Sequence, residues 1–380
     1  MRVLSVNHLL DPVTGGGTAE RTLQLCRHFA RAGVECTLIT LDIGVTRERR
    51  EELAGTRIVA LPCVFRRFPV PRFSWRALKA EVEAAQVVHL MGHWTLLNVL
   101  VFLAARSIGR PCVVCPAGAL PIIGRSKLWK RLYNIVIGRR IIRGAAGHVA
   151  ITQHEIQSFV DYGVSPDRVT VIPNGVPSSA PTCADCPGFL HRHGLEGRSL
   201  VLFLGRLAYI KGPDLLLEAF ANVAERLPAF DLVYAGPDGG MLRELREHAA
   251  RRGVTARVRF MGYVGGDDKA CALQCCELLA IPSRQEAMSI VVLEAGLYGK
   301  PVLLTDQCGF NEVQEIGGGR VVSVNAASIE SALMELAGQP DALPRMGARL
   351  SAFVKQNYTW DGAVAKYRAL FAKTAGPRTS

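Results

Sequence analysis

Two glutamates, Glu286 and Glu294, frame a nearly apolar run in the stretch SRQEAMSIVVLEAG, residues 283–296. Burying a carboxylate is costly unless another group pairs with it or donates a hydrogen bond to it. The apolar run predicts burial, so both glutamates need partners. A polyhydroxylated ligand would supply them, because a carboxylate accepts two hydrogen bonds from a vicinal diol.

The position of the glutamates between a strand and a helix supports a ligand role. Pro282 ends a predicted strand and Ser289 can begin a helix, so Glu286 lies in the loop and Glu294 on the helix. If both face one side, they lie on the order of 10 Å apart, a span that one diphosphate nucleotide covers. Backbone N–H groups of residues 287–289 then meet the phosphates. The alternative is that neither glutamate binds a ligand. Glu294 would then be an exposed helix residue, and Glu286 a charge in the first turn that the helix dipole favours.

A second stretch, LFLGRLAYIKGPDLLLEAF at 202–220, places two cations beside a helix N-terminus. A predicted strand ends at Gly205, and Arg206 and Lys211 bracket the loop before the helix. The helix dipole and its free N–H groups favour anions, and arginine adds a bidentate contact, so this loop suits a diphosphate. The alternative is a loop with two solvated cations.

Strand and helix patterns alternate along the chain, which indicates parallel sheets covered on both faces. The predicted strands are 2–8, 34–40, 87–91, 111–115, 147–152, 168–173, 199–205, 230–236, 257–262, 276–283 and 300–306. In such open sheets, ligands bind beyond the carboxyl ends of the strands. Gly15–Gly17, Arg206 and Glu286 all follow predicted strands at this end.

The alternation stops at PNGVPSSAPTCADCPG, residues 173–188, which is rich in proline, serine and small residues and predicts a linker. A chain of 380 residues is also too long for one ordinary core. We therefore predict two doubly wound α/β domains, 1–175 and 193–360, joined by a linker at 176–192. Residues 361–380 are expected to form a helix and tail that can pack back on the first domain.

The chain is basic, with 45 lysines and arginines against 33 acidic residues and a formal net charge of +12. This excess favours an anionic partner such as phosphates, nucleic acid or an acidic membrane. We do not expect nucleic acid, because aromatic residues make up only 7% of the chain and the phosphate-type residues concentrate at the ends of the predicted strands. The N-terminus lacks a signal-peptide pattern, and the longest apolar run, near 94–105, is too short to cross a bilayer, so we expect a cytoplasmic protein.

Most of the 11 cysteines are expected to be reduced core residues. One segment, TCADCPGFLHRHG, gathers residue types that ligate zinc. These residues are Cys183, Cys186, His191 and His193. The alternative is a polar linker with chance thiols, and the sequence leaves both possibilities open.

The segment RSKLWKRLYNIVIGRRIIRG, residues 125–144, is both basic and apolar. Up to Gly138 its cations oppose its apolar residues on a helical wheel, which suits a helix lying on an acidic membrane. After Gly138 the arginines fall on the formerly apolar side, which argues against a single continuous membrane face. The alternative is a domain helix with a basic solvent face.

Taken together, these stretches resemble glycosyltransferase family 4, the retaining glycosyl transferases of group 1 with the GT-B fold. The resemblance covers nearly the whole chain and rests on GGGTAER, VIPNGV, LGRLAYIKG, YAGPDGG and EAMSIVVLEAG. Its most specific mark is the pair of glutamates with seven residues between them, preceded by Arg206 and Lys211. The resemblance implies two doubly wound Rossmann-like α/β domains that face each other across a cleft.

The resemblance further implies a retaining, metal-independent hexosyltransferase. It would move a hexose or N-acetylhexosamine from a UDP-sugar or GDP-sugar to a saccharide or polyprenyl-diphosphate-linked acceptor. The pathway would be surface polysaccharide or glycolipid synthesis, at the inner face of the cytoplasmic membrane. The acceptor would lie mostly against the first domain, where the Gly15–Gly17 loop closes over the reacting centre.

In this family pattern Arg206 and Lys211 hold the diphosphate, so no metal or other cofactor is expected. Glu286 would bind the sugar hydroxyls and Glu294 the ribose, so that ligand hydroxyls rather than protein cations would satisfy both. The implied donor-binding residues are Gly16, Gly17, Arg206, Lys211, Glu286, Ala287, Met288, Ser289 and Glu294.

Two positions depart from the family pattern. Many relatives carry Pro-His-Gly where this chain has PAGALP, so Ala117 stands at the position of a histidine that approaches the sugar. His93, in LMGHWTLL just past a predicted strand, is the candidate catalytic group that replaces it. The alternative for His93 is a helix-cap or core histidine. Ser289 stands where glycine is frequent.

Two other functions stay open on the same fold. A nucleotide-sugar epimerase would need acid and base carboxylates around the sugar and no acceptor site. A catalytically silent partner subunit is kept open by Ala117, although Arg206, Lys211 and the two glutamates argue against it. A dinucleotide dehydrogenase is not expected, because GGGTAE lacks the G-x-G-x-x-G spacing.

Overall fold

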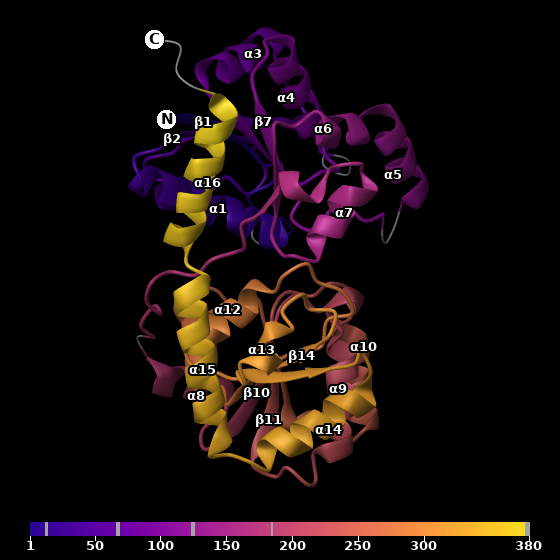
Figure 1. Ribbon diagram of the computed structural model, residues 1–380. Helices are drawn as coiled ribbons and strands as arrows, with labels where there is room; N and C mark the ends of the chain where they lie inside the picture. Colours follow the sequence, from indigo (N-terminus) through magenta and orange to yellow (C-terminus); the bar gives the residue numbers. More distant parts are fainter. Residues whose placement is uncertain (12–13, 66–68, 123–125, 184, 377–380) are drawn as a thin grey trace. The chain divides into compact units, whose positions relative to one another are not determined.

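The computed structural model describes residues 1–11, 14–65, 69–122, 126–183 and 185–376. The chain forms two compact units (Figure 1): the first comprises Met1–Asn174 and Trp360–Ser380, and the second comprises Gly175–Thr359. Residue 125 of the basic segment, residue 184 of the expected linker and residues 377–380 of the expected tail lie outside the described residues.

The first unit is built on a parallel sheet of order β3-β2-β1-β6-β7-β8-β9. Its strands are β1 (Arg2–Val6), β2 (Glu35–Leu41), β3 (Arg57–Leu61), β6 (Val87–Met91), β7 (Cys112–Cys115), β8 (Gly147–Ala150) and β9 (Val169–Val171). Every residue of β6, β7 and β8 is buried, as expected for parallel strands covered on both faces. A short antiparallel pair, β4 (Cys63–Phe65) and β5 (Val70–Pro71), lies apart from this sheet.

Helices cover both faces of the first sheet (Figure 1). They are α1 (Gly16–Arg31), α2 (Arg47–Glu52), α3 (Trp75–Ala84), α4 (Leu96–Ser107), α5 (Lys127–Tyr133), α6 (Arg139–Arg143), α7 (Glu155–Asp161) and α16 (Trp360–Ala375). Apolar residues of α3, α4, α6 and α7 pack with the strands in one core. The final helix, α16, packs against α1, and its Tyr367 and Phe371 contact Phe29. The last segment therefore belongs to the first unit.

The second unit is built on a parallel sheet of order β12-β11-β10-β13-β14-β15. Its strands are β10 (Ser199–Leu204), β11 (Phe230–Ala235), β12 (Val258–Gly262), β13 (Leu278–Ile281), β14 (Val302–Thr305) and β15 (Gly319–Val322). The order runs outward from β10 to β12 and then returns to the other side of β10 with β13. The switch point of this sheet therefore lies between β10 and β13, where open α/β sheets place their ligands.

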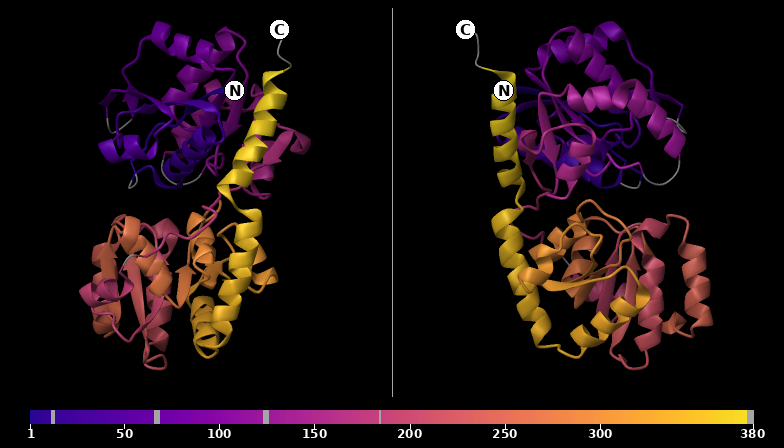
Figure 2. Two further views of the ribbon diagram at one scale, coloured as in Figure 1. Left: turned by 90° about the vertical axis from the view of Figure 1, so that its left-hand side faces the viewer. Right: turned by 45° about the vertical axis from the view of Figure 1, so that its right-hand side comes forward.

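Helices also cover both faces of the second sheet. They are α8 (Cys186–His193), α9 (Pro213–Val223), α10 (Leu242–Arg251), α11 (Gly266–Cys275), α12 (Ile290–Leu297), α13 (Glu312–Glu315), α14 (Ala326–Ala337) and α15 (Ala342–Asn357). Helices α9, α10 and α14 lie on one face, and α8, α12 and α15 lie on the other (Figures 1 and 2). None of the described helices is long and apolar enough to span a membrane.

The structure differs from the expected linker at 176–192, because α8 begins inside it. Asp185 caps this helix by accepting a hydrogen bond from the Gly188 N–H group, and Pro187 occupies its first turn, a position that proline favours. The helix then packs on α11 and buries Phe189. Aspartate followed closely by proline is therefore a helix start here and not only a sign of a linker.

Candidate active site

The candidate site of the second unit lies at the carboxyl ends of β10 and β13. The loop after β10 carries Arg206 and Lys211, and the loop after β13 carries Glu286. These strands are hydrogen-bonded neighbours, so the chain brings together loops that are about 75 residues apart in sequence. The two stretches singled out in the sequence thus meet at the switch point of the sheet.

Lys211 and Glu286 form an ion pair at this edge. Lys211 Nζ lies 2.7 Å from Glu286 Oε1, and the Ser283 hydroxyl donates to Glu286 Oε2 at 3.0 Å. The Glu286 side chain is 14% exposed and that of Lys211 27%. Both carboxylate oxygens therefore have protein partners, and the pair is partly withdrawn from solvent.

Glu294, on α12, pairs with a lysine that the sequence did not single out. Lys269 Nζ, from α11, lies 2.7 Å from Glu294 Oε1. Glu294 Oε2 is buried and has no hydrogen-bond partner among the described residues. A buried acceptor of this kind normally has a donor, and a ligand hydroxyl would provide one.

These pairs correct one expectation. The sequence predicted that ligand hydroxyls rather than protein cations satisfy the two glutamates, whereas Lys211 and Lys269 contact them directly. Arg206 differs from these lysines: it is exposed at the end of β10, and no ion pair or hydrogen bond of its side chain occurs within the described part of the chain. Arg206 is therefore the cation of this edge that is open to an external anion.

The N-terminus of α12 offers backbone donors to the same edge. Ser289 is its N-cap residue and makes no side-chain capping hydrogen bond, so the first N–H groups of the helix have no side-chain acceptor there. Met288 and Ser289 are themselves buried. The loop that contains Gly309 packs closely against the backbone of Ala287. Only glycine fits at position 309, because its φ is +64° and a Cβ there would lie 2.2 Å from the Ala287 carbonyl oxygen. The predicted donor-binding backbone at 287–289 is thus closely packed against a second loop.

Arg284 joins the two loops and was not singled out in the sequence. Its guanidinium forms two hydrogen bonds with the Asp214 carboxylate, at 2.8 and 2.6 Å, and lies 3.9 Å from the centroid of the Tyr209 ring. Its backbone N–H also donates to the Ile210 carbonyl at 2.8 Å. A bidentate and stacked arginine fixes geometry as well as charge. Arg284 therefore sets the position of the loop carrying Lys211 relative to the loop carrying Glu286.

The remaining predicted residues lie in the first unit. Gly16 and Gly17 begin α1 beyond the carboxyl end of β1, and Gly16 has φ +55°. Arg21, five residues further along, is fully buried; it donates to Asn174 Oδ1 at 2.7 Å and to the Ile172 carbonyl at 2.8 Å. The GGGTAER and VIPNGV stretches are therefore held together by one arginine.

His93 lies in the core of the first unit. Its side chain is 2% exposed, its Nε2 lies 3.1 Å from Asn134 Oδ1, and its ring contacts those of Trp94 and Tyr133. Burial lowers the pKa of His93 to about 4, against the smaller opposing effect of the Asn134 contact. These surroundings favour the core-histidine alternative over a catalytic role.

Ala117 lies in a tight turn that a buried carboxylate holds. Its φ of +51° is unusual for a residue other than glycine. The neighbouring Gly118 N–H donates to Glu155 Oε1 at 2.6 Å, and the Ile151 N–H donates to Glu155 Oε2 at 2.7 Å. Burial raises the pKa of Glu155, and the opposing effect of these two backbone hydrogen bonds is smaller. The PAGALP loop is therefore shaped by its backbone contacts.

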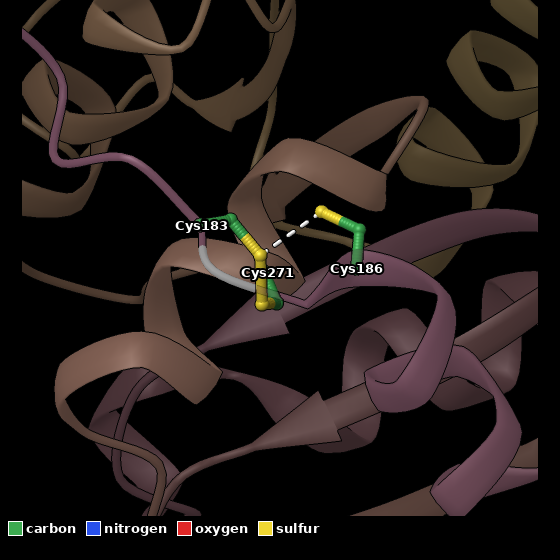
Figure 3. Close-up of side chains that lie close together, drawn as sticks. All are labelled: Cys183, Cys186 and Cys271. Carbon is green, nitrogen blue, oxygen red and sulfur yellow. Dashed lines mark hydrogen bonds between the residues drawn. A yellow bond between two sulfur atoms is a disulfide. The ribbon is translucent and has the colours of Figure 1, made fainter.

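The expected zinc residues do not all come together. His191 pairs with Glu196, and the His193 ring contacts Phe189. Cys183 instead forms a disulfide with Cys271 of α11, which corrects the expectation for that cysteine, while Cys186 Sγ lies 3.0 Å from Cys183 Sγ (Figure 3). The packing of α8 on α11, which the sequence did not predict, brings these sulfurs together.

Comparison with known proteins adds independent evidence. Residues 16–175 match the family model of the glycosyl transferase 4-like domain, and residues 191–349 match that of glycosyl transferases group 1. The D-inositol 3-phosphate glycosyltransferase of Salinispora tropica is 33% identical, over 94% of this chain and 81% of its own length. The protein of the same name from Nocardia farcinica is 31% identical, over 63% of this chain and 56% of its own length, so the match spans about half of that relative.

Solved structures show the same fold. The crystal structure of Anabaena Alr3699/HepE in complex with UDP and glucose has a TM-score of 0.80 at 18% sequence identity, and the match covers 97% of this chain and 98% of that one. Each unit has a parallel α/β sheet, and the likeness to this structure shows the GT-B fold, so the predicted fold class is confirmed. The chain belongs to glycosyltransferase family 4, the glycosyl transferases of group 1, as its sequence motifs indicated.

Proposed function

We propose that this protein is a retaining, metal-independent hexosyltransferase. It takes a hexose or N-acetylhexosamine from a nucleotide-diphosphate sugar and transfers it to a saccharide or polyprenyl-diphosphate-linked acceptor in surface polysaccharide or glycolipid synthesis. The observation that carries the proposal is the meeting of Lys211 and Glu286 beside Arg206 at the switch point of the second sheet.

The proposed donor site assigns one task to each charged residue. Arg206 and Lys211 bind the diphosphate and stabilise the charge that develops as it leaves, together with the N-terminal amides of α12. The Lys211 ammonium has three donors, so it can contact a phosphate and keep Glu286 in place. Glu286 binds sugar hydroxyls, and the unpaired oxygen of Glu294 accepts from a ribose hydroxyl.

Names of similar proteins suggest the first substrates to test. UDP in the Anabaena structure makes UDP-sugars the first donors, with GDP-sugars next. The actinobacterial relatives are named for D-inositol 3-phosphate, which adds a phosphorylated polyol to the saccharide and lipid-linked acceptors. We place the enzyme in the cytoplasm, on the inner face of the membrane.

A membrane-facing surface is proposed on the segment 127–136. Its large apolar side chains are strongly exposed: Leu128 76%, Trp129 71%, Leu132 47%, Ile135 75% and Val136 57%. Exposed apolar residues clustered among Lys127, Lys130 and Arg131 suit an anionic lipid surface. The face ends at α6, where Ile141 and Ile142 turn into the core.

Product analysis tests the proposed activity. The purified chain is incubated with a labelled UDP-sugar and, in separate reactions, with a saccharide, a polyprenyl-diphosphate sugar and D-inositol 3-phosphate. A glycosylated product that keeps the anomeric configuration of the donor, formed equally with and without a chelator, is the expected result. A changed sugar on an intact nucleotide would instead identify an epimerase. Donor binding without turnover on any acceptor would favour a silent subunit.

A further inference from the structure

Four cysteines of the second unit belong to two neighbouring segments. Cys183 precedes α8 and Cys186 is the first residue of that helix, whereas Cys271 and Cys275 belong to α11. Cys183 and Cys271 are 88 residues apart in sequence. The packing of α8 against α11 brings Cys183 and Cys186 to Cys271 (Figure 3).

Three of these sulfur atoms are close enough to share one ion. Those of Cys183, Cys186 and Cys271 all lie within 4.8 Å of one another. Cys275 follows Cys271 by four residues, so both side chains lie on the same face of α11. The Cys275 side chain forms a hydrogen bond with the Cys186 thiol, so Cys275 lies beside one member of this group. The thiol of the next residue, Cys276, instead donates to the Leu273 carbonyl.

We propose that the second unit holds a structural zinc ion through four thiolates, those of Cys183, Cys186, Cys271 and Cys275. The spacings C-x2-C and C-x3-C are those of structural zinc sites, and each pair comes from a different segment. Zinc–sulfur bonds of about 2.3 Å in a tetrahedron set the sulfurs about 3.8 Å apart, and the sulfurs of Cys183, Cys186 and Cys271 already lie within 4.8 Å of one another. The histidines expected from the sequence are replaced by the two cysteines of α11.

The disulfide and the zinc site are two states of the same sulfurs. A cellular dithiol opens the Cys183–Cys271 bond by two exchange steps: the dithiol is oxidised to a disulfide, and both cysteines become thiols. Zn²⁺ then displaces four protons and forms four zinc–sulfur bonds, which leaves a complex of net charge −2. The Lys300 charge, which acts on Cys275, and the N-terminus of α8 offset this charge. The reducing compartment proposed above favours the zinc state.

The zinc ion would fix an element of the candidate site. It ties α8 to α11, and α11 also carries Lys269, the partner of Glu294. Structural zinc contributes directly to folding stability. The site thus stabilises the unit that binds the donor without taking part in the reaction.

Metal analysis of the untagged full-length chain tests this proposal. The protein is purified with dithiothreitol and without chelators, incubated with zinc, desalted and analysed by mass spectrometry of metals. We expect about one zinc per chain. Cobalt in place of zinc should give the thiolate-to-cobalt charge-transfer and tetrahedral d–d absorption bands.

Variants separate the proposed ligands from their neighbours. Cys275→Ser and Cys186→Ser should each lower the zinc content at least about tenfold, although neither removes a cysteine of the disulfide. Cys63→Ser, a half-buried cysteine of the first unit, is the matched control and should keep its zinc. The double variant His191→Ala with His193→Ala should also keep it.

Three results would overturn the proposal. The first is that the reduced wild-type chain takes up no zinc. The second is that Cys275→Ser keeps one full equivalent of zinc per chain. The third is that iron with acid-labile sulfide, rather than zinc, occupies the site. If the cysteine variants do not fold, thiol titration of the wild type replaces them. A mercurial reagent should release the zinc as about four thiols are modified per chain, and zinc release that does not follow thiol modification would contradict the four-thiolate set.

Discussion

Each glutamate of the candidate site shares an ion pair with a lysine from another loop or helix: Glu286 with Lys211, and Glu294 with Lys269. These pairs keep the carboxylates oriented, because an unpaired, partly buried carboxylate would turn towards water. They also set the charge balance of the site, where Arg206 remains the one residue of the predicted anion-binding pair not engaged by a described acid. We infer that the site is preorganised for a ligand with both phosphates and hydroxyls.

At the residue scale, Glu286→Gln and Lys211→Ala should each lower kcat/KM for transfer by about 10²-fold or more, because each removes a charged contact to the reacting group. The chain should still fold but melt at a lower temperature, because each change leaves one partner of a mostly buried ion pair without its counter-charge. Steady-state kinetics and thermal unfolding measure the two effects. Glu330→Gln, in the surface pair with Arg226, is the control. Unchanged turnover in either site variant would remove that residue from the site.

Part of this site was predictable from the sequence and part was not. Arg206, Lys211 and Glu286 could be found because they follow strand patterns, and the carboxyl ends of parallel strands share one edge. Lys269 lies on a helix whose sequence shows no sign of contact with Glu294, so only tertiary packing reveals it. Arg284 was inside the quoted motif, but its partner Asp214 is 70 residues away.

At the element scale, the segment from α5 to α6 is interrupted by a π-helical turn at Asn134–Gly138. A π-helical turn adds a residue and rotates the positions that follow it. The apolar residues before it are exposed, and those after it are buried. The sequence predicted that the apolar side of the helix changes after Gly138, and the π-helical turn ends at that residue. The exposed apolar face is therefore confined to 127–136.

The double variant Trp129→Ser with Ile135→Ser should weaken binding to anionic phospholipid vesicles by about tenfold or more, because it removes two large apolar contacts, each about 1.5–3 kcal/mol when fully buried. Vesicle sedimentation measures this binding. Leu103→Ser, on exposed α4 surface, is the control and should bind as the wild type does. Equal binding by the double variant, or no binding by the wild type, would contradict the membrane-facing surface.

The strands of the two parallel sheets were largely predictable, with two exceptions. Long, continuously apolar runs gave the central strands, whose residues are buried on both faces. The edge strands β3 and β15 were missed, because most of their residues are only half buried and their apolar runs are short. Edge strands carry a weaker pattern, since one side of the strand has no neighbour to pack against.

At the scale of the whole molecule, the first unit carries neutral histidines in its core. Burial lowers the pKa of His89 to about 3, with a smaller contribution from the Arg21 charge, and lowers that of His93 to about 4. In the unfolded chain a histidine has a pKa of about 6.5. Below that pH the unfolded chain binds protons that the folded unit does not. The contribution of these neutral histidines to the stability of the unit is therefore fully present above pH 6.5 and is lost as the pH falls towards their pKa values in the folded unit.

Each of these histidines should contribute about 1.4 kcal/mol per pH unit to this loss between pH 6 and 4.5. All four tryptophans, Trp75, Trp94, Trp129 and Trp360, lie in the first unit, so tryptophan fluorescence during urea unfolding follows that unit alone. His93→Gln should lower the slope of unfolding free energy against pH by about one proton. The same slope in the variant and the wild type would show that His93 is not the titrating group.

The central claim, a nucleotide-sugar site held by cationic side chains, is tested most directly by donor binding. The melting temperature of the purified chain is measured with UDP, GDP, ADP and their sugar conjugates, each with and without EDTA. Every EDTA sample is compared with an EDTA-only baseline, so that any loss of structural zinc cancels. A ligand that binds only the folded state must raise the melting temperature.

We predict a clear shift with one nucleotide and its sugar conjugates, of equal size with and without EDTA, that is lost in Lys211→Ala. A shift that disappears with EDTA would contradict metal-independent binding. No shift with any nucleotide, or the same shift in Lys211→Ala, would contradict the donor site proposed at the ends of β10 and β13.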